Sequence, residues 1–133
     1  AAWQRPKPGQ TCLSPDAVAA LCRDMATAER EQFAVVCLNV RGKLISREIV
    51  AQGSVSQCPV SPRDCFHRAV RDNAHTCILV HNHPSGDPSP SMEDRDLTAR
   101  LCAAAELLGI KVRDHVIVAQ NGYFSFVEAG FIR

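Results

Sequence analysis

The sequence feature that most constrains the fold is an apolar run that passes directly into two closely spaced histidines. Residues 77–80 have the continuous apolar character of a buried strand. His81 and His83 follow, and because side chains alternate along extended backbone, both imidazoles point to the same side. A loop with three prolines and Gly86 then leads to a helical pattern that begins near Ser91. The chain therefore has to place two imidazoles between the end of a strand and the start of a helix.

Two histidines and a carboxylate, with a fourth position open, form the ligand set of a catalytic zinc site rather than a structural one. The histidines alone could equally be ordinary loop residues. We favour Asp94 as the carboxylate because Ser91 and Asp94 share one face of the first helical turn. The same pair has the spacing of a capping box, which explains both residues by helix initiation alone. The rival carboxylates are Asp87, Glu93 and Asp96.

A hydrolytic metal site also needs a base that takes a proton from the attacking water. Glu31 stands at the entrance of an apolar strand expected over residues 33–38, where it can meet the strand that carries the histidines. Glu29 and Glu48 are alternatives by position. We interpret His115, which lies in an apolar stretch, as a structural residue rather than a further ligand.

These segments resemble the JAMM (MPN-plus) metalloprotease motif. That motif has a Glu, then His-x-His, then ten residues and an Asp, with a Ser three positions before the Asp, and this chain has the same pattern. The segment HNHPSGDPSPSMEDRDLT, over residues 81–98, is similar to the corresponding segment of bacterial RadC proteins. The similarity runs from about residue 14 to the C-terminus.

The resemblance implies that His81, His83 and Asp94 bind one zinc ion, with water at the fourth position. It implies that Glu31 is the general base and that Ser91 stabilises the oxygen of the tetrahedral intermediate. It also implies the MPN architecture, which is similar to that of cytidine deaminases. RadC proteins usually carry an N-terminal helical region, suggestive of DNA binding, before this domain. This sequence does not include that region, which argues against a DNA role for this piece.

Periodicity predicts an α/β fold in which helices sandwich a mixed sheet. Residues 1–13 read as a tail or linker, and residues 14–133 as a single RadC-like JAMM/MPN-plus domain. Val70 and Leu108 are expected to face inward from their helices. The expected helices cover residues 14–27, 61–73 and 91–108, and the expected strands cover residues 33–38, 44–51, 76–80, 111–119 and 123–127.

Composition narrows the possible functions. The net charge is +1, from 15 basic and 14 acidic residues without a basic block, which argues against a nucleic-acid binder. The seven cysteines are odd in number and form no CxxC, so we interpret them as small buried hydrophobes in a reducing compartment, with a disulfide framework as the alternative. The chain has neither a secretory leader nor an apolar run of membrane-spanning length, and we expect a cytoplasmic protein.

We therefore expect a zinc-dependent metallopeptidase or isopeptidase that acts on a protein or peptide substrate, whose identity the sequence does not specify. One alternative is a DNA-repair-associated module, as the RadC name suggests. A second is a metal-stabilised interaction module with little or no hydrolytic activity, and a third is a metal-dependent phosphodiesterase. An exposed edge strand over residues 44–51 could pair two copies into a homodimer.

Overall fold

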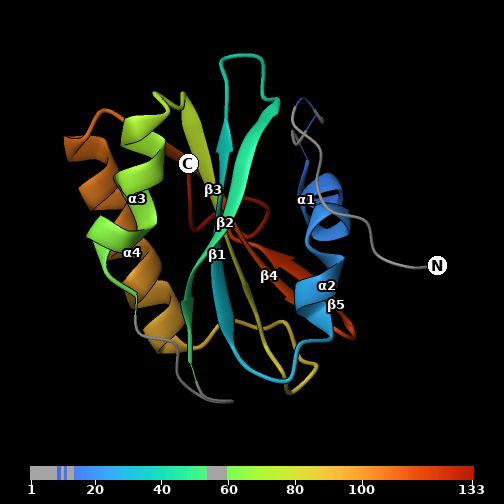
Figure 1. Ribbon diagram of the computed structural model, residues 1–133. Helices are drawn as coiled ribbons and strands as arrows, with labels where there is room; N and C mark the ends of the chain where they lie inside the picture. Colours follow the sequence, from blue (N-terminus) through green and yellow to red (C-terminus); the bar gives the residue numbers. More distant parts are fainter. Residues whose placement is uncertain (1–8, 10, 12–13, 54–59) are drawn as a thin grey trace.

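The fold is a five-stranded sheet with helices on both faces (Figure 1), seen in a computed structural model that describes residues 9, 11, 14–53 and 60–133. The strand order is β2-β1-β3-β4-β5. β3 and β4 are parallel, and the other neighbouring pairs are antiparallel. The predicted α/β class with a mixed sheet between helices is confirmed. The strands are β1 (Gln32–Leu38), β2 (Leu44–Gln52), β3 (Thr76–Asn82), β4 (Lys111–Ala119) and β5 (Gly122–Ser125).

Helices α1 (Pro15–Leu21) and α2 (Arg23–Ala26) lie on one face of the sheet, and α3 (Pro62–Arg71) and α4 (Met92–Leu107) lie on the other (Figure 1). The first helix on each face starts in the same way, with a serine N-cap followed by proline, whose fixed φ suits the first helical position. None of the helices in the described ranges is long and apolar enough to cross a membrane.

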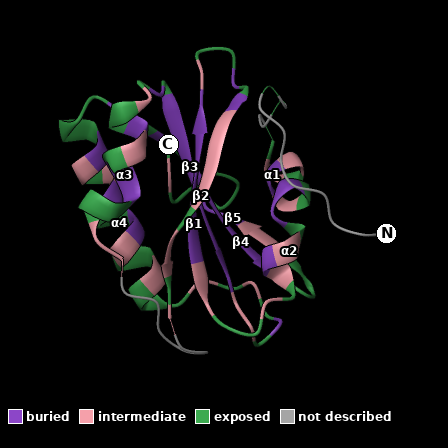
Figure 2. Ribbon diagram, in the orientation of Figure 1, coloured by how far each residue is buried: buried purple, intermediate pink, exposed green. Residues whose placement is uncertain are grey.

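Strand β3 is buried along its whole length, as the purple central strands of Figure 2 illustrate. Alternation divides its side chains between two cores: Ile78 and Val80 pack toward α1 and α2, whereas Cys77 and Leu79 pack toward α3 and α4. By the same alternation, His81 faces the α3/α4 side. The strand therefore delivers an imidazole into the layer that contains the start of α4.

The parallel pairing of β3 with β4 requires a long crossover, and α4 provides it. The chain leaves the carboxyl end of β3, passes through the proline-rich loop and enters α4, which runs back across the sheet before β4 begins. The first turn of α4 consequently lies beside the end of β3. The topology thus places the histidines and the start of α4 together at the carboxyl end of β3.

The helix expected over residues 14–27 is wrong in one respect, because it breaks at Cys22. The carbonyl of Leu21, which an unbroken helix would use internally, accepts a hydrogen bond from Arg47 of β2. The same guanidinium binds both carboxylate oxygens of Asp24 at 2.7 Å. The break therefore depends on a partner from a distant strand, which local periodicity does not reveal.

Two expected core positions are also wrong: Val70 is 55% exposed and Leu108 is 52% exposed. Helix α3 contacts the sheet through a narrower stripe than the pattern suggested, made of Cys65, Phe66 and Ala69. Leu108 follows the last residue of α4, where the chain turns away through Gly109 at φ +74. Apolar residues at the margins of a helix's apolar stripe were thus wrongly assigned to the core.

No disulfide joins any two of the cysteines that the structure describes, and four of them, Cys22, Cys37, Cys65 and Cys77, are buried. This agrees with their interpretation as small core residues. Cys12 and Cys58 lie outside the described residues, as does most of the tail expected over residues 1–13. Within that segment, Thr11 forms an isolated bridge with Lys43.

Candidate metal centre

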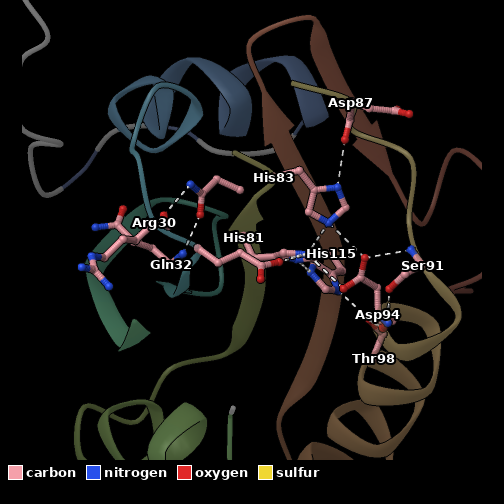
Figure 3. A network of polar contacts seen from close by, with 11 residues as sticks. Arg30, Gln32, His81, His83, Asp87, Ser91, Asp94, Thr98 and His115 are labelled. Atoms are coloured by element: carbon pink, nitrogen blue, oxygen red, sulfur yellow. Dashed lines mark hydrogen bonds and ion pairs between the residues drawn. The ribbon is translucent and has the colours of Figure 1, made fainter. Parts of the chain in front are cut away.

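His81 occupies the buried end of β3, where only 3% of the residue is exposed. Its ring stacks on Phe33 of β1 at a centroid distance of 5.8 Å. Phe33 is also its cross-strand partner, so the register of β1 against β3 sets the ring's position. Its Nδ1 lies 2.7 Å from Nε2 of His115, which leaves Nε2 of His81 facing the site (Figure 3).

His83 follows the last residue of β3, and the pairing with β4 continues through it because its N–H donates to the carbonyl of Val118. Its Nδ1–H donates to the carbonyl of Asp87 at 2.9 Å. A carbonyl can only accept, so this bond leaves Nε2 of His83 unprotonated whenever the ring is neutral. Gly86, at φ +94 and in contact with Asn121, makes the tight loop that returns Asp87 over the ring.

Asp94 serves the helix and the site at once. Its carboxylate accepts from the backbone N–H of Ser91 at 2.8 Å, and the Ser91 hydroxyl accepts from the N–H of Asp94 at 3.0 Å, which completes a capping box. The same carboxylate lies 3.2 Å from His81 Nε2 and 3.0 Å from His83 Nε2. The two interpretations of Asp94 drawn from the sequence therefore hold together.

Glu31 lies just before β1 and approaches the histidines from the other side, with its Oε1 4.0 Å from His81 Nε2. Asn82, which is fully buried, holds the backbone on both sides of Glu31. Its Oδ1 accepts from the N–H of Gln32 at 2.6 Å, and its Nδ2 donates to the carbonyl of Arg30 at 3.0 Å. The side chain between the two histidines thus positions the segment that carries the acid.

The ionisable groups of the cluster shift one another's pKa values. Partial burial raises the pKa of the Glu31 carboxyl group, and the charges of His81 and His83 only partly oppose this effect. Burial also opposes ionisation of Asp94, but hydrogen bonds from the two imidazoles in their protonated state, in which each Nε2 carries a hydrogen, outweigh burial and hold its pKa well below the usual range. Burial works against the charged form of His83, yet its bonds to Asp94 and to the Asp87 carbonyl leave its pKa raised.

The donor set fits a zinc ion. Glu31, His81, His83 and Asp94 each offer a ligand atom, and these atoms all lie within 4.8 Å of one another. A tetrahedral site with bonds of about 2.05 Å has edges of about 3.3 Å. The two imidazole Nε2 atoms lie 3.0 Å apart, and the distances from these atoms to Asp94 are similar. Three donors are therefore spaced for one ion, with Glu31 farther away.

The rival residues lie elsewhere. Asp87 is exposed, and its carboxylate accepts from the N–H of Ser89. Glu48 pairs with Arg68 and His67 at the surface of α3. Glu29, Glu93 and Asp96 are exposed.

Contacts around His115 were not anticipated. We interpreted this residue as structural; it is fully buried and touches the site through His81 rather than as a member of the four-residue cluster. Burial, together with the nearby charge of His81, lowers its pKa well below that of free imidazole. Its other ring nitrogen meets the hydroxyl of Thr98 on α4. A polar Thr one turn after Asp94, on the buried face of the helix, was the available sequence signal.

Comparison with known proteins agrees with the fold and identifies the family. The family model "RadC-like JAB domain" matches residues 12–131. A UPF0758 protein of Symbiobacterium thermophilum is 48% identical over 108 residues, which cover 81% of this chain and 46% of the relative. A UPF0758 protein of Thermotoga maritima is 48% identical over 109 residues, or 82% of this chain and 49% of the relative.

A third relative, the UPF0758 protein of Syntrophotalea carbinolica, is 40% identical over 127 residues, which cover 95% of this chain and 56% of the relative. The chain spans about half the length of the curated relatives it matches. The resemblance to RadC proteins is confirmed by these matches. The chain belongs to the RadC-like JAB domain family.

Proposed function

We propose that this domain is a zinc-dependent hydrolase that cleaves peptide or isopeptide bonds. The observation that carries the proposal is the convergence of two imidazoles and two carboxylates, from three separate segments of the chain, within 4.8 Å. His81, His83 and Asp94 would hold the ion because their donor atoms have the spacing of one coordination sphere. When bound, zinc supplies a Lewis acid that lowers the pKa of a water molecule to about 7 and polarises a carbonyl group.

The remaining residues divide the proton chemistry between them. Glu31 takes a proton from the attacking water and delivers it to the leaving amine, a role that suits a carboxylate 4.0 Å from His81 Nε2 and outside the three closely spaced donors. The Ser91 hydroxyl oxygen already accepts from the N–H of Asp94, so its own hydrogen is available to the substrate oxygen that gains negative charge.

The proposal is tested by elemental analysis of the purified protein together with a screen of peptide and isopeptide substrates. We expect one zinc ion per chain and zinc-dependent cleavage. Glu31→Gln should keep the zinc and lower turnover by about 10²- to 10⁴-fold, since it removes only the proton acceptor. His81→Ala should lose the zinc.

A matched control is Glu29→Gln, which removes an exposed carboxylate from the same segment and should change neither zinc content nor turnover. Full activity in Glu31→Gln would remove that residue from the mechanism. Stoichiometric zinc without cleavage of any substrate would instead favour a metal-stabilised interaction module.

A further inference from the structure

A chain of hydrogen bonds connects the backbone of α4 to His81 through two residues of the interior. The Thr98 hydroxyl lies 2.7 Å from the carbonyl of Asp94 and also contacts Nδ1 of His115. Nε2 of His115 lies 2.7 Å from Nδ1 of His81. Thr98 is 3% exposed and His115 is not exposed at all, so these contacts lie in the interior, away from bulk solvent.

The direction of each hydrogen bond follows from the first one. The Asp94 carbonyl can only accept, so the Thr98 hydroxyl donates its single hydrogen to it. The hydroxyl oxygen then accepts from Nδ1–H of His115. A neutral His115 ring has its lone pair on Nε2, which accepts from Nδ1–H of His81. Nε2 of His81 is left unprotonated and faces the other ligand atoms.

His83 reaches the same state by a simpler route, because its Nδ1–H donates to the carbonyl of Asp87. His81 has no such partner: the ring that meets it, His115, could donate or accept according to its own tautomer. Only the hydroxyl of Thr98, itself oriented by α4, removes that ambiguity. The tautomers of the two histidines are thus set by different partners. The tautomer of His81 depends on residues of α4 and β4.

We propose that Thr98 and His115 form a relay that fixes His81 in the Nδ1–H tautomer and so keeps its Nε2 ready for a metal ion. The relay rests on the zinc site of the proposed function, and Thr98 and His115 act in it as positioning residues. Two aromatic rings contact His115: Phe126 stacks on it at a centroid distance of 4.6 Å, and Phe33 meets it edge-on at 5.5 Å. The imidazole is therefore held in one orientation.

The matched pair Thr98→Val and Thr98→Ser separates the hydroxyl from the volume of the side chain. Valine has nearly the same shape as threonine but cannot orient His115, whereas serine keeps the hydroxyl. Two readouts are needed: long-range ¹H–¹⁵N spectra of the imidazoles in the metal-free protein at mildly alkaline pH, and the zinc Kd measured by competition with a chromophoric chelator.

We expect His81 and His115 of the metal-free wild type to be Nδ1–H tautomers. Thr98→Val should mix the tautomers of His115 and raise the zinc Kd by about 10-fold or more, the usual effect of losing an outer-shell partner. Thr98→Ser should retain the wild-type spectrum and Kd. An Nε2–H tautomer of His115 in the wild type, or an unchanged Kd in Thr98→Val, would overturn the relay.

Neither readout needs turnover, which separates this inference from the proposed hydrolysis. A protein that binds zinc but cleaves nothing would contradict the hydrolase and leave the relay intact. If Thr98→Val does not fold, as judged by circular dichroism, or if no zinc binds, the tautomers in the metal-free wild type decide the question alone.

Discussion

Asn82 shows how one side chain between the histidines can organise a residue far from it in sequence. Its amide provides an acceptor for the N–H of Gln32 and a donor for the carbonyl of Arg30, as a neighbouring strand would. The carbonyl of Glu31 itself accepts from Gly53 beyond the end of β2. The segment that carries the acid is thus fixed at three consecutive residues, which limits the positions that its carboxylate can reach.

Asn82→Ala should therefore destabilise the protein. The substitution leaves the N–H of Gln32 and the carbonyl of Arg30 without these partners, at a cost of about 1–3 kcal/mol in the free energy of unfolding. Urea denaturation of the zinc-loaded protein measures it. The control is Gln32→Ala, because Asn82 binds the backbone of that residue and not its side chain. Equal stability of the two variants would show that the amide does not hold the segment.

At the scale of single residues, the sequence predicted the arrangement of the cluster well where its residues are only a few positions apart. The separation of His81 from His83, and of Ser91 from Asp94, follows from the periods of strand and helix. Glu31 was harder to place because its distance from the histidines depends on how β1 pairs with β3, where Phe33 lies opposite His81. The relay through His115 was missed because it joins residues whose neighbourhood exists only in the folded chain.

Among the elements, α4 agrees most closely with expectation, since both of its ends carry local signals. Residues 91–108 were expected and Met92–Leu107 is observed, with the capping box at the start and Gly109 after the end. The hairpin of β4 and β5 forms where the Asn121-Gly122 signal predicted a turn, but its loop is one residue earlier: Ala119 pairs with Gly122, which leaves residues 120 and 121 in the loop. The break between α1 and α2 was not predictable from local sequence, because the carbonyl at the break accepts a hydrogen bond from Arg47 of β2.

The hydrogen bond between Tyr123 of β5 and Asp16 of α1 gives a measurable link between two elements. The phenol donates to the carboxylate at 2.8 Å, and this bond raises the pKa of Tyr123 to about 12. Because this value lies above that of an unfolded tyrosine, about 10, the bond adds stability below the unfolded pKa, and this contribution is lost as the pH rises through the folded pKa.

Tyr123 is the single tyrosine of the chain, so an alkaline titration followed by phenolate absorbance reports on it alone. We expect a midpoint near pH 12, as its raised pKa of about 12 requires, and a lower midpoint in Asp16→Asn. A wild-type midpoint equal to that of the unfolded chain would show that β5 and α1 are not joined in this way.

Across the whole molecule, the strand order β2-β1-β3-β4-β5 decides what can meet at the site. Central strand β3 carries the histidines, its antiparallel neighbour β1 begins beside Glu31, and the crossover to the parallel neighbour β4 starts with α4. Class and layers could be predicted from the alternation of helices and strands. The order of the strands could not, because pairing between distant segments leaves no local pattern.

Zinc binding should stabilise the entire fold, since the ligand atoms come together only in the folded chain. At free zinc about 100 times the Kd, binding adds about 2.7 kcal/mol to the free energy of unfolding. We expect thermal melting to shift upward with added zinc and downward with a chelator. His81→Ala should show neither shift. A zinc response that persists in His81→Ala would place the ion elsewhere.

The double use of Asp94 restricts how this site can change during evolution. Asparagine would still accept from the N–H of Ser91 but would bring no negative charge to the imidazoles. Glutamate would also suit the capping box, but its longer side chain would change the distance from the carboxylate to the two imidazoles. A lineage that abandons the metal is free to change its histidines one by one. It still needs a side chain at position 94 that accepts from the N–H of Ser91, so the aspartate can persist after the metal site is lost.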